Sequence, residues 1–344
     1  MATGSLSPPP GLAAALPGLA RKLGPGLLVC GAVGLAGWAI AAWTQWPGIV
    51  IALVIGIALH PLASGVRFQP GYVMAVKKLL RIAIAFLGVR VALGDFAALG
   101  LPVAGLVVLT MAITLASGIL LARLVGRSAA YGALAGGATA VCGASAAMAI
   151  ASVLPRTKDG DTDAAYVVLT VNVLSTAAML AYPWLSHTLG LDLRATGILL
   201  GATIHDVAQV VGAGNAVSEL TANVATIVKL LRVFLLLPVV LLIGIGFSAS
   251  GADAGKAKVP VPGFAIMFVV FATLNSFHLF PEIVRTGLLA LSQAGLFMAI
   301  AALGLQTSLA AMIRLGWRPM AVVLGATLIL LGAALIGLRL IGAA

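Results

Sequence analysis

Long apolar stretches recur along the whole chain, and they constrain its fold more than any other feature. A stretch such as 101–123 matches the roughly 20 residues that a helix needs to cross the hydrocarbon core of a bilayer. Hydrophobic residues make up 62% of the 344 residues and charged residues only 8%, whereas about 25% of the residues in soluble domains are charged. A soluble core could not bury so much apolar surface. The sequence therefore predicts an all-α polytopic membrane protein.

Hydropathy predicts eleven membrane-spanning helices, with boundaries uncertain by several residues. The predicted spans are 24–43, 47–60, 77–95, 101–123, 129–154, 164–186, 194–213, 220–246, 260–280, 285–310 and 319–342. Residues 1–23 are predicted to form a disordered cytoplasmic leader. The run 24–43 is long for a signal peptide, so we expect it to be retained as an extra N-terminal span.

Basic residues are distributed unevenly between the two predicted faces of the membrane. The connections on the N-terminal side carry Arg21, Lys22, Arg67, Lys77, Lys78, Arg123, Arg127, Arg194, Lys256, Lys258, Arg314 and Arg318. The opposite connections carry only Arg156, Lys158 and Arg285, and nearby aspartates offset the first two. The positive-inside rule then predicts a protein of the cell inner membrane with a cytoplasmic N-terminus and an outside C-terminus. The net charge of +11 follows this topology and does not indicate a nucleic-acid partner.

Motifs for cofactors and metals are absent from the sequence. The two cysteines, Cys30 and Cys142, lie in apolar segments and do not indicate a disulfide framework. No zinc spacing, nucleotide-binding loop or dinucleotide fingerprint is present. We therefore expect no cofactor and no metal, and any transport energy must come from a gradient.

Two pairs of short strings are related at a nearly constant offset. VKKLLRIAI (76–84) resembles IVKLLRVFL (227–235), and IGIALH (55–60) resembles LGATIH (200–205). Spans two and three thus correspond to spans seven and eight, and a shift by an odd number of spans inverts the second copy. The pattern predicts a 5+5 inverted repeat, with copies at 44–190 and 191–344, as in secondary transporters. The alternative is that KLLR is a common basic cluster at the membrane interface.

Small and polar residues interrupt the apolar pattern in two spans. The fifth contains GGATAVCGASAAMA (136–149) and the tenth contains AALGLQTSLAAM (301–312), each in the fourth helix of its copy. A helix that opens inside a membrane is tolerated where it lines a cavity, and the N-terminal end of its second half attracts anions. The pattern predicts two crossed discontinuous helices. The alternative is close packing of small residues between helices.

Several motifs together resemble the YeiH family, whose members are described as sulfate exporters. They are GGATAVCGASAAMA, GATIHDVAQVVGAG (201–214), VKLLRVFLLLP (228–238), NSFHLFP (275–281) and MAIAALGLQTSL (298–309). The resemblance runs from about residue 25 to the end. That family is grouped with the cation/proton antiporter and bile-acid symporter-like superfamily. The resemblance therefore implies panel and core domains, and dimers are common in this superfamily.

The most informative candidate residues are His205 and Asp206. Ionisable residues inside a span are costly and indicate function. Gln209 shares a helix face with His205, and a histidine can change protonation near physiological pH. We expect these three residues to line the pathway and to couple proton movement to transport. The alternative is that His205 and Asp206 cap or lock the seventh helix. A third residue of interest, Arg90, is expected to pair with Asp95.

The other candidate substrate-binding residues lie at the two predicted breaks and on the eighth span. Those at the first break are Gly137, Ala138, Thr139, Cys142, Gly143 and Ser145. Those at the second are Gln306 and Thr307, together with the neighbouring Ser308. Arg232 and its repeat counterpart Arg81 could bind an oxyanion through two parallel hydrogen bonds, or could extend to lipid headgroups.

The predicted function is secondary transport of a small anion by alternating access. The resemblance favours sulfate or a related sulfur oxyanion, and the coupling ion would be a proton or sodium. A cation/proton antiporter is one alternative, but it needs carboxylates at the midplane and only Asp206 is well placed. A membrane enzyme or sensor using Cys142 and His205 is the other alternative. Adjacent His and Asp point to different helix faces, so we expect no enzymatic activity.

Overall fold

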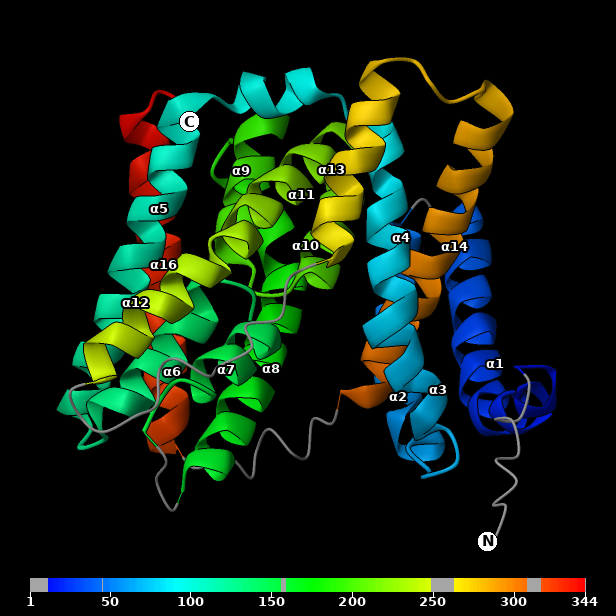
Figure 1. Cartoon of the computed structure of the whole chain (residues 1–344). Coiled ribbons are helices and arrows are strands. Elements are labelled where there is room, and N and C mark those ends of the chain that lie inside the picture. Colours follow the sequence, from blue (N-terminus) through cyan, green and yellow to red (C-terminus); the bar gives the residue numbers. More distant parts are fainter. Residues whose placement is uncertain (1–11, 45, 156–158, 249–262, 308–316, 344) are drawn as a thin grey trace, which may run out of the picture.

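The computed structural model describes residues 12–44, 46–155, 159–248, 263–307 and 317–343. Within these ranges the chain consists of helices joined by short turns, with no strand. The helices form two bundles that stand side by side (Figure 1).

The first bundle is built mainly from the N-terminal helices and α14, on the right of Figure 1. Its elements are α1 (Leu12–Thr44), α2 (Gly48–Ala63), α3 (Gln69–Met74), the π-helical turn η1 (Ala75–Leu79), α4 (Leu80–Leu87), the 3-10 turn η2 (Gly88–Arg90) and α14 (Glu282–Gln306). Helices α2 and α14 cross closely at Gly304, where a Cβ atom would lie 2.4 Å from the carbonyl oxygen of Leu53. Helix α13 (Gly263–Ser276) packs against η2, because a Cβ at Gly88 would lie 2.3 Å from the carbonyl oxygen of Phe268.

The second bundle contains the remaining helices, on the left of Figure 1. They are α5 (Leu93–Leu124), α6 (Ala129–Ala140), α7 (Ala144–Ala151), α8 (Gly160–Thr188), α9 (Leu193–Thr203), α10 (Val207–Val217), α11 (Glu219–Phe234), α12 (Leu236–Ser248) and α16 (Trp317–Leu340). Helix α5 kinks at Gly100, and its longer part packs against α6 where Gly118 meets Gly136.

Six helical stretches among the described residues are long and apolar enough to cross a membrane. They are Arg21–Thr44, Leu93–Leu124, Gly160–Thr188, Glu219–Phe247, Glu282–Gln306 and Met320–Leu340. Three shorter apolar helices, Gly48–Ala63, Val207–Val217 and Gly263–Ser276, accompany them. These lengths and the helical fold agree with a polytopic α-helical membrane protein.

The predicted fifth span is a helical hairpin, which we call the first hairpin (residues 129–151). Helix α6 ends at Ala140 and α7 begins at Ala144, so the interruption lies where the sequence predicted it. The two halves do not continue in one direction, however. A Cβ atom at Gly137 would lie 2.4 Å from Cδ1 of Ile150, which shows that α7 folds back beside α6. Gly143 makes the reversal, with φ +66° and ψ −122°.

The predicted seventh span is a second hairpin (residues 193–217), interrupted at 204–206. Its first half, α9, runs parallel to α11, since Gly197 faces Val224 and Gly201 faces Val228. Its second half, α10, leads directly into α11 and returns along it, with Gly214 against Ala222. In Figure 1 the first hairpin occupies the lower half of its bundle and α9 the upper half. Two predicted single spans are therefore hairpins that enter from opposite ends.

The predicted break in the tenth span falls at the edge of the described residues. Helix α14 runs from Glu282 to Gln306, and Thr307 is its C-cap. The helix therefore ends inside the string in which the break was predicted, and residues 308–316, which include Ser308 and the expected second half, lie outside the described residues. The first hairpin is the fourth element of the first predicted copy, whereas the second hairpin is the first element of the second predicted copy. The inverted repeat itself stays a prediction.

Two further expectations change with this topology. Helix α1 begins at Leu12, so residues 12–23 of the predicted leader are helical, whereas residues 1–11 lie outside the described part. Arg194 was expected at the opposite end of the protein from the C-terminus, but it lines the same pocket as Ile341. The reason is that the first hairpin returns the chain to the end from which it entered. Arg156, Lys158, Lys256, Lys258 and Arg314 also fall outside the described residues.

Candidate functional site at the hairpin tips

The tips of the two hairpins meet inside the second bundle. A Cβ atom at Gly143 would lie 3.7 Å from Cβ of His205, so the reversal of one hairpin touches the reversal of the other. Each tip contains the end of one half-helix and the start of the next. The last carbonyl groups of a helix and its first N–H groups lack partners within the helix, so buried tips need partners from elsewhere.

Lys229 of α11 supplies partners to both tips. Its side chain is fully buried, and Nζ donates to the carbonyl oxygen of Val141 at 2.6 Å and of Ile204 at 2.9 Å. These carbonyls lie at the C-terminal ends of α6 and α9, where the helix dipole favours a cation. One ammonium group therefore joins the two hairpins.

Arg232, one turn further along α11, extends the same bridge and is also fully buried. In the first hairpin its Nε and Nη2 donate to the carbonyl oxygen of Ala140 at 2.9 and 2.6 Å, and Nη2 also donates to Thr139 at 2.9 Å. In the second hairpin Nη1 donates to the carbonyl oxygens of Gly201, Ala202 and Ile204 at 3.2, 2.6 and 3.3 Å. Every nitrogen of the guanidinium group is thus bound to backbone, and Arg232 has no nitrogen left for lipid headgroups.

The start of α10 is organised by Asp206 and helix α8. Asp206 caps α10, since Oδ1 accepts from the N–H of Ala208 at 2.8 Å. The N–H of Asp206 donates to Oγ of Ser175 at 3.1 Å, and that hydroxyl donates to Oε1 of Gln209 at 3.1 Å. Gln209 in turn donates through Nε2 to Oγ1 of Thr176 at 3.3 Å. Capping, the structural alternative for Asp206, is therefore part of its role.

The start of α7 is arranged differently. Its N-cap is Gly143, which has no side chain to accept from the first N–H groups. Ser145 in the first turn is exposed. The sulfur of Cys142 accepts from the N–H of Ala146, but the N-cap itself supplies no acceptor, so the positive end of a helix dipole lies next to the tip of the second hairpin.

His205 is fully buried and points toward α16. Its Nε2 lies 3.0 Å from Oγ1 of Thr327, whose hydroxyl donates to the carbonyl oxygen of Val323 at 2.8 Å. Because the threonine proton is used in this way, the hydrogen-bond network assigns the proton of the ring to Nε2. Nδ1 has no hydrogen-bond partner of good geometry among the described residues.

The charges at the tips do not cancel. Lys229 and Arg232 contribute two buried cations, and Asp206 is the only carboxylate at the tips among the described residues. Arg81 on α4 of the first bundle lies near enough for its charge to act on Asp206. The tips therefore hold more basic than acidic side chains. Such a site attracts an anion and repels a cation.

The structure brings together most but not all of the predicted site residues. Those at the tips are Thr139, Cys142, Gly143, Ser145, His205, Asp206, Gln209 and Arg232, while Gly137 and Ala138 lie in the last turns of α6. Gln306 and Thr307 lie elsewhere, at the end of α14 in the first bundle, where the carbonyl oxygen of Leu305 is 2.7 Å from Nδ1 of His60. Cys142 is buried, and Nε2 of His205 contacts Thr327 rather than Cys142.

Sequence reasoning missed the role of Lys229. It was grouped with basic residues that extend to headgroups, because a KLLR string is common at interfaces. A signal was present, since Lys229 and Arg232 are one helical turn apart within a long apolar span. The supporting hydroxyl groups of Ser175 and Thr327 could not be linked to the tips by spacing alone.

Comparisons with known proteins place these features in a family. The family described as "Conserved hypothetical protein 698" matches residues 25–323. The UPF0324 membrane protein TauZ of Paracoccus pantotrophus is 42% identical over 329 residues, covering 94% of this chain and 97% of that protein. The UPF0324 membrane protein RB0971 of Rhizobium meliloti is 42% identical over 322 residues, covering 93% of each chain. That of Chlorobaculum tepidum, CT0845, is 38% identical over 89% of this chain and 86% of its own. No solved structure matches the chain.

Proposed function

The chain belongs to the UPF0324 family of membrane proteins, the YeiH family, and we propose that it is a secondary transporter that moves a small anion across the inner membrane by alternating access. One observation carries this proposal. Two hairpins enter one bundle from opposite ends, and their tips are joined around the buried cations Lys229 and Arg232. Interrupted helices that meet inside the membrane are the usual binding sites of secondary transporters.

The positive excess at the tips supports an anion as the substrate. Two cations face one carboxylate there, and burying an uncompensated charge costs several kcal/mol. An anion bound beside the tips would balance the charge, whereas a cation would increase the excess. This argues against the cation/proton antiporter. The resemblance to the family favours sulfate or a related sulfur oxyanion over other small anions.

The anion is expected to contact polar groups that have no hydrogen-bond partner in the described part of the chain, and Arg232 is not one of them. All nitrogens of Arg232 already donate to backbone carbonyls, so it supplies charge rather than direct hydrogen bonds. The N–H groups at the start of α7 before Ala146, with the exposed Ser145, remain available. Arg81 approaches Asp206 from the other bundle. An anion between these groups would contact both bundles, as alternating access requires.

The two bundles correspond to the moving parts. The hairpin bundle would act as the core and the first bundle as the panel. Helix α10 contacts the first bundle near Gly212, where a Cβ would lie 3.4 Å from Cγ2 of Ile49. The bundles also meet in an ion pair between Arg90 of the first bundle and Glu219 of the second bundle. Movement of one bundle against the other would expose the tips to alternate faces, with a proton or sodium as coupling ion.

Counterflow in proteoliposomes tests this proposal. Vesicles containing the protein and unlabelled sulfate are assayed for uptake of radiolabelled sulfate, with and without a pH gradient, and with sulfite, thiosulfate and small carboxylates as competitors. We expect uptake that Lys229→Gln abolishes, because the substitution removes one cation from the tips. Lys78→Gln is the matched control, since Lys78 is the repeat counterpart of Lys229 and is exposed. Folding of each variant is checked by size-exclusion chromatography.

Different results separate the parts of the proposal. Flux of another anion without sulfate flux would keep the mechanism and refute the sulfur oxyanion. No flux of any anion by folded protein would refute the transporter. Equal flux in Lys229→Gln and Lys78→Gln would show that the charge at the tips does not act on the substrate.

A further inference from the structure

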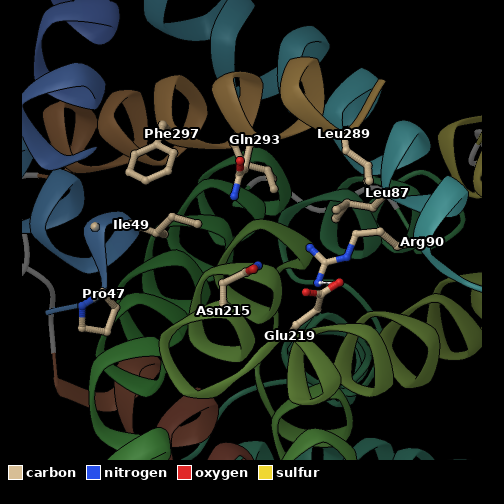
Figure 2. A pocket seen from close by; sticks show the side chains of 11 residues that line it. Pro47, Ile49, Leu87, Arg90, Asn215, Glu219, Leu289, Gln293 and Phe297 are labelled. Atoms are coloured by element: carbon tan, nitrogen blue, oxygen red, sulfur yellow. Dashed lines mark ion pairs between the residues drawn. The ribbon is translucent and has the colours of Figure 1, made fainter. Parts of the chain in front are cut away.

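A polar cavity lies between the two bundles, away from the hairpin tips. Its volume is about 340 Å³, within the range of pockets that hold small molecules. Its polar lining comes from Arg90 of η2, Asn215 of α10, Glu219 of α11 and Gln293 of α14, and its other lining residues are mostly apolar (Figure 2). We call it the outer pocket, because it lies at the end where α2 begins, which the positive-inside rule places outside.

Arg90 presents an incompletely used donor edge to the outer pocket. Its side chain is only 13% exposed, and its ion pair is a single contact of 2.9 Å between Nη2 and Oε1 of Glu219. Neither Nε nor Nη2 makes a hydrogen bond with the described residues. The expected pairing with Asp95 was wrong, since the carboxylate of Asp95 accepts from the N–H of Ala92 instead.

Another arginine of the same protein shows what a complete pairing looks like. Arg285 donates through Nε and Nη2 to the two carboxylate oxygens of Glu282, at 3.0 and 2.8 Å. This fork is the preferred geometry of guanidinium with a carboxylate or another oxyanion. In Arg90 the same two nitrogens are buried beside Glu219, which satisfies neither with good geometry. The edge is therefore suited to a second oxyanion.

The carboxylate of Glu219 can move away from Arg90 into water. Its side chain is 72% exposed at the rim of the pocket, and exposed ion pairs contribute little to stability. The start of α11 does not depend on it, because Ser218 caps that helix by accepting from the N–H of Thr221 at 3.0 Å. Water can therefore solvate Glu219 once another anion has replaced it beside Arg90.

We propose that the outer pocket binds a small oxyanion or carboxylate through Nε and Nη2 of Arg90, in exchange for Glu219. The amide of Gln293, which points into the cavity (Figure 2), supplies a further polar contact. Because Arg90 and Glu219 belong to different bundles, binding also removes an ion pair that joins the two bundles at this end. The outer pocket is then the site that admits an anion from the outer side, an inference that rests on the proposed transport function.

Charge-selective modification of a cysteine tests this site without a transport measurement. Leu289→Cys places a thiol on the apolar lining of the pocket, while both native cysteines are buried. The full-length protein in detergent is treated with 2-sulfonatoethyl methanethiosulfonate, which is anionic, or with the cationic 2-trimethylammonioethyl reagent. Each rate is divided by the rate of the same reagent with 2-mercaptoethanol, because a thiolate intrinsically favours the cationic reagent. We expect this normalised rate to be about tenfold higher for the anionic reagent than for the cationic one, since a local cation raises the rate of anion encounter. Sulfate and acetate should each slow the reaction.

Variants of the pair assign the effect to Arg90. Arg90→Gln should bring the ratio of the two rates close to one and remove protection by sulfate. Glu219→Gln should raise both the ratio and the degree of protection. Arg90→Lys keeps the charge and loses the fork, so the ratio should persist while protection weakens; this variant serves if Arg90→Gln does not fold. Arg285→Gln, on the same end but outside the pocket, is the matched control and should change neither.

The outcomes distinguish this inference from the proposed function. A ratio or a protection that is unchanged in Arg90→Gln overturns the anion site in the outer pocket. Sulfate counterflow without protection of the thiol refutes the pocket and leaves the transporter standing. Protection that depends on Arg90, without flux of any anion in proteoliposomes, supports the binding site and refutes transport.

Discussion

Replacing Arg232 with glutamine is expected to destabilise the protein strongly, because one side chain holds two hairpins together. Four of the carbonyl groups that accept from Arg232 receive no hydrogen bond from Lys229. They belong to Thr139, Ala140, Gly201 and Ala202. Glutamine is shorter and has two N–H donors in place of five, so it leaves most of these buried carbonyls without a partner.

The size of the effect follows from this set of hydrogen bonds. A buried acceptor left unsatisfied costs about 1–3 kcal/mol, so four cost roughly 4–12 kcal/mol. Removing the guanidinium also removes its own desolvation penalty, which offsets several kcal/mol. The net loss is then about 3–5 kcal/mol, the usual cost of deleting one partner of a buried charged network. For a chain of this length that corresponds to a melting midpoint lowered by about 4–7 °C.

The assay is a thermal melt of the purified protein in detergent, followed by the fluorescence of its five tryptophans. Arg81→Gln is the matched control, since Arg81 is the repeat counterpart of Arg232 and is exposed. Substitution of an exposed residue changes stability by only about 0.5 kcal/mol, so its midpoint should stay within about 1 °C of the original protein. Equal midpoints for Arg232→Gln and Arg81→Gln would refute the assignment of Arg232 as the bridge between the hairpins.

Three further substitutions test particular contacts by the same thermal melt. Gly143→Ala should cost about 1–2 kcal/mol, because φ at this tip is +66°, where L side chains are strained; an unchanged midpoint would contradict the reversal at Gly143. Gly304→Val should disrupt the first bundle, since a Cβ there would lie 2.4 Å from a backbone oxygen of α2, whereas Gly332→Val on α16 meets open space and should be tolerated. Equal behaviour of these two would argue against the close α2–α14 crossing. Thr327→Val should cost about 0.5–1.5 kcal/mol through the lost hydrogen bond with His205, and a gain in stability would show that this bond does not position the ring.

The interruption of the first hairpin could be predicted from local sequence. Residues 136–149 contain small and polar residues and three glycines in a chain whose other spans are rich in large aliphatic residues. Helix α6 ends inside this stretch and α7 begins inside it. The direction of the second half could not be predicted, because it depends on packing. The contact of Gly137 with Ile150 joins residues that a straight helix would hold far apart.

The second interruption could not be located in the same way. The stretch 304–308 has the composition of a break, and α14 ends inside it at Gln306. The stretch 201–206 contains only one glycine, yet it opens. Helix propensity is a weak guide to such an opening. What stabilises it is that Lys229 and Arg232 bond to the carbonyls freed at 201–204.

The sequence by itself determined the class of the protein, the approximate position of most helices and the family. These features depend on hydropathy and on local motifs, and a span needs only enough apolar residues to match the thickness of a bilayer. Tertiary structure alone decided which helices open, that they fold back, and that Lys229 and Arg232 are buried between them. A free carbonyl group inside a membrane is stable only where a donor meets it. Here the donors on α11 lie up to 93 residues away along the chain, so only the folded structure shows which donor meets which carbonyl.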